Sequence, residues 1–103
     1  MRIEFRNKHL LKLYTDGKTK KYDIPRNIFV KYTMRVQQLE AAVTIHDLWK
    51  TASLNFKSLK GFKNRYSVRV DKQWRLEIEI AWEDKEKTKG VIYIVELSKH
   101  YGD

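Results

Sequence analysis

The sequence contains no cysteine, and this absence excludes disulfide bonds, thiolate zinc sites and catalysis by a cysteine nucleophile. Its three histidines, His9, His46 and His100, are too scattered along the chain for their spacing to predict a metal site. We therefore expect a protein that uses neither a metal nor another cofactor.

Long apolar runs are also absent. The longest run, Val91–Val95, is far shorter than the roughly 20 residues that a membrane-spanning helix needs. The first residues, Met1–Arg6, lack the apolar stretch of a secretory signal. These features predict a soluble, cytoplasmic protein with no membrane partner.

Proline and glycine are scarce, with one proline and four glycines in 103 residues. Together with 42% apolar residues, this composition is typical of a folded protein and not of a disordered tail. A chain of this length fits one hydrophobic core. We expect a single domain over residues 1–103.

Positive charge is abundant. The chain has 22 lysines and arginines against 13 acidic residues, a formal net charge of +9. Between Lys50 and Leu76 there are eight basic residues and one acidic residue, Asp71. Such an excess indicates a polyanionic partner, either nucleic acid or an acidic protein.

The first half of the chain has helical patterns. After an alternating segment at residues 2–6, apolar residues recur at helical spacing up to Asp16-Gly17, which predicts a strand and a short helix. Pro25 opens a longer helix, whose apolar stripe consists of Ile28, Tyr32, Val36, Leu39 and Val43. Thr44 and Asp47 have capping-box spacing and predict a further brief helical turn.

The second half alternates with a period of two. Strands are expected at Tyr66–Val70, at Trp74–Trp82 and at Val91–Leu97, with a tight turn at Asp71-Lys72. Trp74 and Trp82 fall in the apolar register, and we expect all three tryptophans, including Trp49, to belong to the core. The order of elements predicts an α+β fold, with two N-terminal helices packed on one face of a mainly antiparallel sheet of four to five strands.

This register directs a set of basic residues to one side. Arg75 is expected on the open, solvated face of the sheet, with Arg69 near it across the turn. Lys57, Lys60 and Lys63 approach from the preceding segment, and the tail residues 99–101 can fold back to this face. Alternatively, the lysines only confer solubility and Arg75 forms a structural ion pair with Glu77, Glu79 or Glu96.

Cations beside an imidazole and a phenol suit metal-independent cleavage of RNA. The ribose 2′-OH must lose a proton to attack its own phosphate, negative charge accumulates on the phosphorane oxygens, and the leaving 5′ oxygen must be protonated. The products would be a 2′,3′-cyclic phosphate and a 5′-hydroxyl end.

Three short segments resemble the signature of HigB-like toxins in the RelE/ParE superfamily. They are Ser58-Leu59-Lys60-Gly61, Tyr66-Ser67-Val68-Arg69-Val70 and Gln73-Trp74-Arg75-Leu76, which are similar to a "PLKG…(W/Y)S(I/V)…WR(I/L)" pattern. The opening Phe5-Arg6-Asn7-Lys8, followed by a leucine-rich helix, is also similar, so the resemblance spans nearly the whole chain.

The resemblance implies the RelE fold and a ribosome-dependent mRNA endonuclease, that is, the toxin of a type II toxin–antitoxin system. It also implies a HigA-like helix-turn-helix antitoxin, and a toxin–antitoxin complex that binds its own operator DNA. Lys60 and Arg75 take the positions of the lysine and arginine that bind the scissile phosphate in the family. Around them, the RNA-binding residues are expected to be Lys63, Arg65, Arg69 and Lys99.

The sequence departs from the family pattern at two places. Lys57 stands where the family has a histidine, and Lys99-His100-Tyr101 replaces the terminal acidic-Tyr-His ending. RelE itself is similar in using lysines, arginines and a C-terminal tyrosine. Our hypothesis is that His100 or Tyr101 handles the 2′-OH proton and that Lys57 assists.

Two other functions remain open from the sequence. A ParE-like toxin shares the fold but poisons gyrase without catalysis, and a non-enzymatic RNA-binding domain would bind RNA with strong salt dependence and leave it intact. The combination of Lys60, Arg75, His100 and Tyr101 favours the endoribonuclease.

Overall fold

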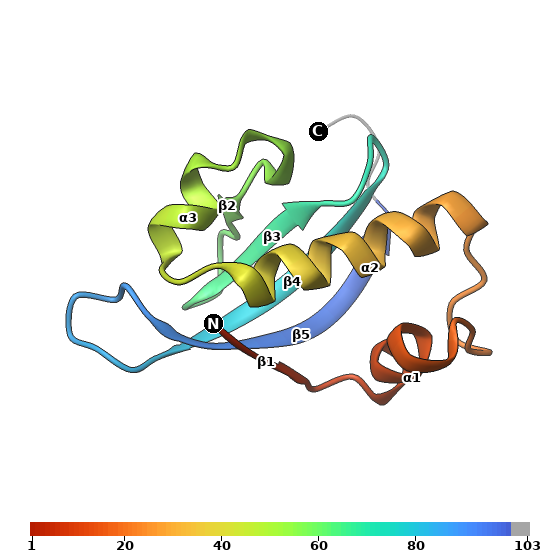
Figure 1. The fold of residues 1–103 in the computed structure, drawn as a ribbon, viewed down its shortest axis with the longest axis horizontal. Helices are drawn as coiled ribbons and strands as arrows, with labels where there is room; N and C mark the ends of the chain where they lie inside the picture. The colour runs from red at the N-terminus through yellow and green to blue at the C-terminus, as the bar shows by residue number, and fades with distance from the viewer. Residues whose placement is uncertain (100–103) are drawn as a thin grey trace.

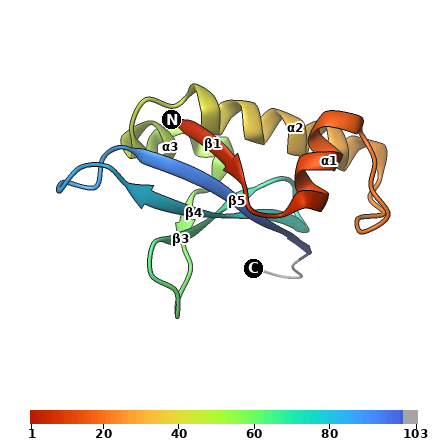
Figure 2. The same cartoon turned by 90° about the horizontal axis from the view of Figure 1, so that it is seen from below.

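A five-stranded sheet forms one layer of the structure, and the helices cover one of its faces (Figures 1 and 2). The computed structural model describes residues 1–99. The strands are β1 (Arg2–Phe5), β2 (Lys57–Ser58), β3 (Arg65–Arg69), β4 (Trp74–Trp82) and β5 (Gly90–Lys99). The helices are α1 (Lys8–Asp16), α2 (Arg26–Ala41), α3 (Ile45–Lys50) and the 3₁₀ turn η1 (Ala52–Leu54).

The strand order is β1-β5-β4-β3-β2, and every neighbouring pair is antiparallel except β1 and β5. The expected α+β fold with a mainly antiparallel sheet is therefore confirmed. The short α3 packs on the same side of the sheet as the two longer helices (Figure 2).

The first helix, α1, begins and ends where local chemistry predicts. The side-chain oxygen of Asn7 caps α1 by accepting from the backbone N–H groups of His9 and Leu10, at 3.0 and 3.3 Å. Gly17, with φ of 80°, ends this helix in the left-handed conformation. The hydroxyl of Tyr32 in α2 donates to the Leu10 carbonyl at 2.7 Å, which ties the two helices together.

The predicted stripe of α2 is correct up to Leu39 and wrong at Val43. The chain leaves the helix at Ala42, which has ψ of 137° and is buried, while Val43 is 66% exposed. The reason is the capping box of α3. Asp47 Oδ2 accepts from the Val43 and Thr44 N–H groups at 2.8 and 3.1 Å, so these two residues serve the next helix.

The sheet face under the helices is apolar and buried, as its alternation predicts. Its central residues are Leu76, Ile78 and Ile80 of β4, and Ile92, Ile94 and Leu97 of β5. Leu97 keeps this orientation because a register shift at Glu77/Ile78 places one extra residue in β5 between Ile94 and Glu96.

Two expectations about burial are wrong. The opposite face of β4 is not simply solvated, since Arg75 is 5% exposed and Ser67 on β3 is 1% exposed. Trp74 and Trp82 are partly buried against the core. Trp49 is half-exposed because Ile45 and Leu48 form the buried face of α3, and its ring contacts Phe56 at 4.6 Å between centroids. In the described residues, no helix combines the length and apolarity that crossing a membrane requires.

Asn7 provides a test of how α1 is capped. Replacing Asn7 with alanine removes the cap of α1, and we expect the free energy of unfolding to fall by about 1 kcal/mol or somewhat more. Asn7→Ser retains an oxygen at the cap but not the amide that donates to Tyr22 and Val95, and it should recover part of this loss. Urea unfolding followed by circular dichroism measures both variants. Equal stability of the alanine variant and the wild type would contradict the assignment.

Candidate active site

Arg75 is held rigidly on the sheet face opposite the helices. Its side chain crosses β3: Nε donates to Ser67 Oγ at 2.9 Å, and Nη2 donates to the carbonyls of Asn55 and Ser67 at 2.8 and 3.4 Å. Asn55 reaches this position because it ends η1 in a left-handed conformation, with φ of 42°. Arg75 is therefore oriented in advance of any ligand.

Two more cations lie around Ser67. Lys57 of β2 is directly opposite Ser67, and Arg69 of β3 is directly opposite Arg75. Directly opposed residues on antiparallel strands project from the same face with Cβ atoms about 5 Å apart. We call Lys57, Arg69 and Arg75 the cation cluster. It would attract an anion such as a phosphate.

Lys60 and Lys63 lie in the loop between β2 and β3, which extends from the sheet on the side away from the helices (Figure 2). The loop begins at a hydrogen bond from Leu59 N–H to the Arg65 carbonyl, 2.9 Å long. Both lysines are exposed. The loop therefore brings Lys60 and Lys63 to the same side of the sheet as Arg75.

Arg65 occupies this face but is engaged within the protein. Its guanidinium forms ion pairs with Glu77 Oε1 at 3.7 Å and Glu79 Oε2 at 3.0 Å. Arg6 Nη1 also donates to Glu79, at 2.8 Å. Hydrogen bonds from Arg6 and Arg65 hold the pKa of Glu79 below its ordinary value. The charge of Arg65 is thus largely balanced within the protein, and its expected role in RNA binding stays a prediction.

Of the three tail residues expected in the site, Lys99 lies within the described part of the chain. Lys99 pairs with Trp74 across β4 and β5, and its Nζ lies 5.8 Å from the Trp74 ring centroid. It therefore projects from the face opposite to that of Ser98 and Arg75. His100 and Tyr101, the expected acid–base residues, lie outside the described residues.

A second polar network lies beside the last strand, and the sequence did not indicate it. Asn7 Nδ2 donates to the Tyr22 hydroxyl at 3.0 Å, and this hydroxyl donates to Glu96 Oε1. Burial and the neighbouring Glu96 raise the pKa of Tyr22 to about 12. The phenol is consequently neutral at physiological pH and serves as a donor to Glu96, not as a base.

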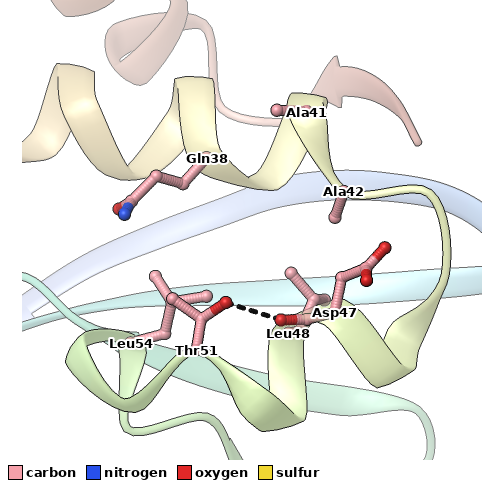
Figure 3. Close-up of a pocket in the computed structure, with 7 residues that line it drawn as sticks. All are labelled: Gln38, Ala41, Ala42, Asp47, Leu48, Thr51 and Leu54. Atoms are coloured by element: carbon pink, nitrogen blue, oxygen red, sulfur yellow. Dashed lines mark hydrogen bonds between the residues drawn. The ribbon is translucent and has the colours of Figure 1, made fainter.

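Two hollows lie beside α2, and the second shares Arg69 with the cation cluster. One, of about 340 Å³, lies between α2 and the α3–η1 segment (Figure 3). Asp47 is the single charged residue of its lining, and its carboxylate caps α3. The other, of about 570 Å³, lies between α2 and the β3–β4 turn. Its cations are Lys31, Arg35, Arg69 and Lys72. Only the second hollow suits a polyanion.

Sequence reasoning identified Arg75 but missed what holds it. Ser67 is the hydroxyl partner, and the Asn55 carbonyl is the backbone partner. Ser67 could have been found, because it lies between Arg65 and Arg69 in the alternation of β3 and so shares a face with Arg75. Nothing local predicts the Asn55 carbonyl. Among residues 1–99, no three His, Cys, Asp or Glu side chains converge to hold a metal ion.

Comparison with known proteins agrees with the fold. The structure is similar to that of a YoeB/ParE toxin from Agrobacterium tumefaciens, with a TM-score of 0.55 over 98% of this chain and 100% of that chain. The two sequences are 13% identical, so this likeness concerns the fold alone. No curated protein sequence matches the chain.

The fold is therefore that of RelE-like toxins, with two helices and a short third helix on a five-stranded sheet. Residues 3–94 match the family model of HigB-like toxins, described as the RelE-like toxin of the type II toxin–antitoxin system HigB. The chain belongs to the HigB-like toxin family. A type II toxin has a cognate antitoxin, which is thus one partner of this protein.

Ser67 tests how the cation cluster is built. Ser67→Ala removes the acceptor of Arg75 Nε in a buried site, and we expect it to lower the free energy of unfolding by about 1–3 kcal/mol. Ser58→Ala, at an exposed serine of β2, is the matched control and should change stability by less than about 0.5 kcal/mol. Urea unfolding measures both. Similar values for the two variants would show that the Ser67 hydroxyl does not support Arg75.

Glu79 provides a test by pH. Because its pKa is lowered from the ordinary 4.5, the folded state gains stability that is complete above pH 4.5 and is lost as the pH falls through the lowered pKa. We expect Glu79→Gln to make the melting temperature less sensitive to acidification below this value. Thermal unfolding between pH 7 and pH 3 measures the slope. An unchanged slope would contradict the role of the Arg6 and Arg65 contacts.

Proposed function

We propose that this HigB-like toxin is a metal-independent endoribonuclease that cleaves mRNA on the ribosome and so inhibits translation. The observation that carries the proposal is the buried guanidinium of Arg75, fixed by Ser67 and Asn55 between Lys57 and Arg69. Membership of the HigB-like family supports it. The substrate is a ribose–phosphate junction of single-stranded RNA.

In the proposed reaction the 2′-OH attacks its neighbouring phosphorus and the bond from phosphorus to the 5′ oxygen breaks. Arg75 and Lys60 would stabilise the negative charge that develops on the phosphorane oxygens, because fixed donors need no reorganisation as the reaction proceeds. His100 or Tyr101 would exchange the protons of the 2′ and 5′ oxygens, with assistance from Lys57. The products carry a 2′,3′-cyclic phosphate and a 5′-hydroxyl.

The ribosome would supply what this small site lacks. The cation cluster spans few residues and holds few nucleotides, so a flexible RNA would rarely reach the in-line geometry unaided. The basic hollow between α2 and the β3–β4 turn, with Lys31 and Lys72 on its rim, is suited to phosphates of ribosomal RNA. Docking there would engage Arg69 and would leave Lys57 and Arg75 for the message.

The partners follow from the same family membership. We propose that the antitoxin is a HigA-like helix-turn-helix protein and that the toxin binds operator DNA only within the toxin–antitoxin complex. The excess of 22 basic over 13 acidic residues favours an antitoxin with acidic segments. A protein that acts on mRNA and ribosomes would act in the cytoplasm.

Arg75→Ala tests this function directly. We expect it to abolish growth arrest and to lower ribosome-dependent cleavage about 10²- to 10³-fold, because it removes a fixed donor from the developing charge. Inducible expression in a bacterium, with mapping of new transcript 5′ ends, measures both effects. Arg2→Ala, at an exposed arginine of β1, removes the same charge and should leave cleavage unchanged.

Arg75→Lys separates folding from chemistry, since it retains a positive charge but not the planar guanidinium. It should fold, as checked by circular dichroism, and cleave well below the wild type. Growth arrest by the wild type without new transcript ends would overturn the proposal. Double-strand DNA breaks in those cells would favour a gyrase poison, and RNA binding without cleavage would favour a non-catalytic domain.

A further inference from the structure

Phe62 occupies an unusual place in the loop between β2 and β3. It is 57% exposed, more than Trp49 at 49%, and it lies between the exposed Lys60 and Lys63. It is not among the residues of the hydrophobic core or those packed against it. A single exposed apolar side chain is ordinary on a protein surface. The residues around Phe62 distinguish it from this ordinary case.

Arg65 supports the ring of Phe62 from one side. The guanidinium carbon of Arg65 lies 4.5 Å from the ring centroid. Arg65 is itself fixed, because Glu77 and Glu79 bind its two terminal nitrogens at 3.7 and 3.0 Å. The aromatic ring therefore rests on an immobilised cation while more than half of the residue stays open to solvent.

The loop that carries Phe62 is anchored at its base. Asn64, with φ of 60°, accepts a hydrogen bond from Ile80 N–H through its carbonyl and from Trp82 Nε1 through its side chain, both at 3.0 Å. Gly61, with φ of 85°, turns the chain just before Phe62, and a Cβ there would meet nothing within 4 Å. The backbone on both sides of Phe62 therefore has a defined conformation, which positions the ring.

The position of Phe62 relative to the cation cluster fits one RNA strand. Arg65 and Arg69 project from the same face of β3, four residues apart, which corresponds to about 13 Å along a strand. Arg69 is directly opposite Arg75. An RNA backbone held at Arg75 would therefore bring a base one or two nucleotides away to Phe62. Glu77, which lies between them, is paired with Arg65.

We propose that Phe62 stacks on a base of the RNA substrate, one or two nucleotides from the scissile phosphate, and positions the strand for cleavage. Unpaired RNA bases bind to proteins by stacking on aromatic rings and guanidinium planes, and every base has a face that can stack. Lys63 would contact the phosphate next to that base. The proposal extends the endoribonuclease function and rests on it.

The experiment uses the full-length toxin and ribosomes programmed with short mRNAs. For binding, the scissile ribose carries a 2′-O-methyl group, so that no cleavage occurs, and single abasic sites are placed at successive positions around it. Phe62→Ala should weaken binding about tenfold on the intact mRNA, as expected for the loss of one stacked base. An abasic site at the stacked position should weaken the wild type similarly and leave Phe62→Ala unaffected.

Other variants isolate the aromatic ring. Phe62→Trp and Phe62→Tyr should retain wild-type binding, whereas Phe62→Leu, which keeps apolar volume but no aromatic face, should resemble Phe62→Ala. Met34→Ala, at a similarly exposed apolar residue on α2, should change nothing. With cleavable mRNA, Phe62→Ala should raise KM more than it lowers kcat, since the ring binds a base away from the reacting atoms.

The outcomes distinguish this inference from the proposed function. If the wild type cleaves programmed ribosomes but no abasic position removes the effect of Phe62→Ala, the stacking role is wrong and the endoribonuclease stands. If the coupling between Phe62 and one base persists while cleavage is absent, stacking stands and the function is wrong. If Phe62→Ala weakens only antitoxin binding, the ring belongs to a protein interface and the inference is overturned.

Discussion

The hydrogen bonds of Arg75 are the constraint on which the candidate site depends. A guanidinium is costly to bury unless its donors are satisfied, and here a hydroxyl accepts from Nε and two carbonyls accept from Nη2. Because Asn55 follows η1 directly and Ser67 belongs to β3, the bonds join the segment before the edge strand β2 to the interior of the sheet. The position of Arg75 therefore depends on the same packing that closes the core, through the buried Leu54 and Phe56 on either side of Asn55.

One face of the sheet is apolar and packs on the helices, and the other is polar. The extra residue in β5 keeps the two faces distinct. Without it, the strict alternation of β5 would turn Leu97 toward the open face and Glu96 into the core. With it, Leu97 is 3% exposed beneath the helices, and Glu96 lies opposite Glu77. The bulge thus lets one strand serve both a continuous apolar core and a polar face.

The sequence predicted the elements well where one local rule applies. Apolar spacing and caps located α1 and α2, and alternation located β3 and β4, because period and terminus chemistry are local properties. It failed where distant segments compete for one residue. Val43 fits the apolar stripe of α2, but its backbone N–H donates to Asp47 in the capping box of α3. Arg75 fits an exposed position of β4 but is covered by a carbonyl 20 residues away.

The candidate site shows the same limit in its electrostatics. Nearly all the charged residues between positions 50 and 76 are basic, which suggests a uniformly cationic surface. In the fold, the register of β3 and β4 brings Glu77 and Glu79 against Arg65, and Arg6 arrives from the end of β1. The open face is therefore not uniform: ion pairs with Glu77 and Glu79 balance the charge at the Arg65 end, and Lys57, Arg69 and Arg75 lie at the other end.

This polarity has a consequence for how a nucleic acid strand can lie on the face. A uniformly cationic sheet would bind a polyanion in many registers, since phosphate contacts carry no sequence information. If the proposed function holds, the grouping of Lys57, Arg69 and Arg75 would restrict strong phosphate binding to the neighbourhood of Arg75. The balanced end then contributes aromatic and neutralised surface, which suits a base better than a phosphate. Together, the two ends favour one register of a strand, with a phosphate at Arg75.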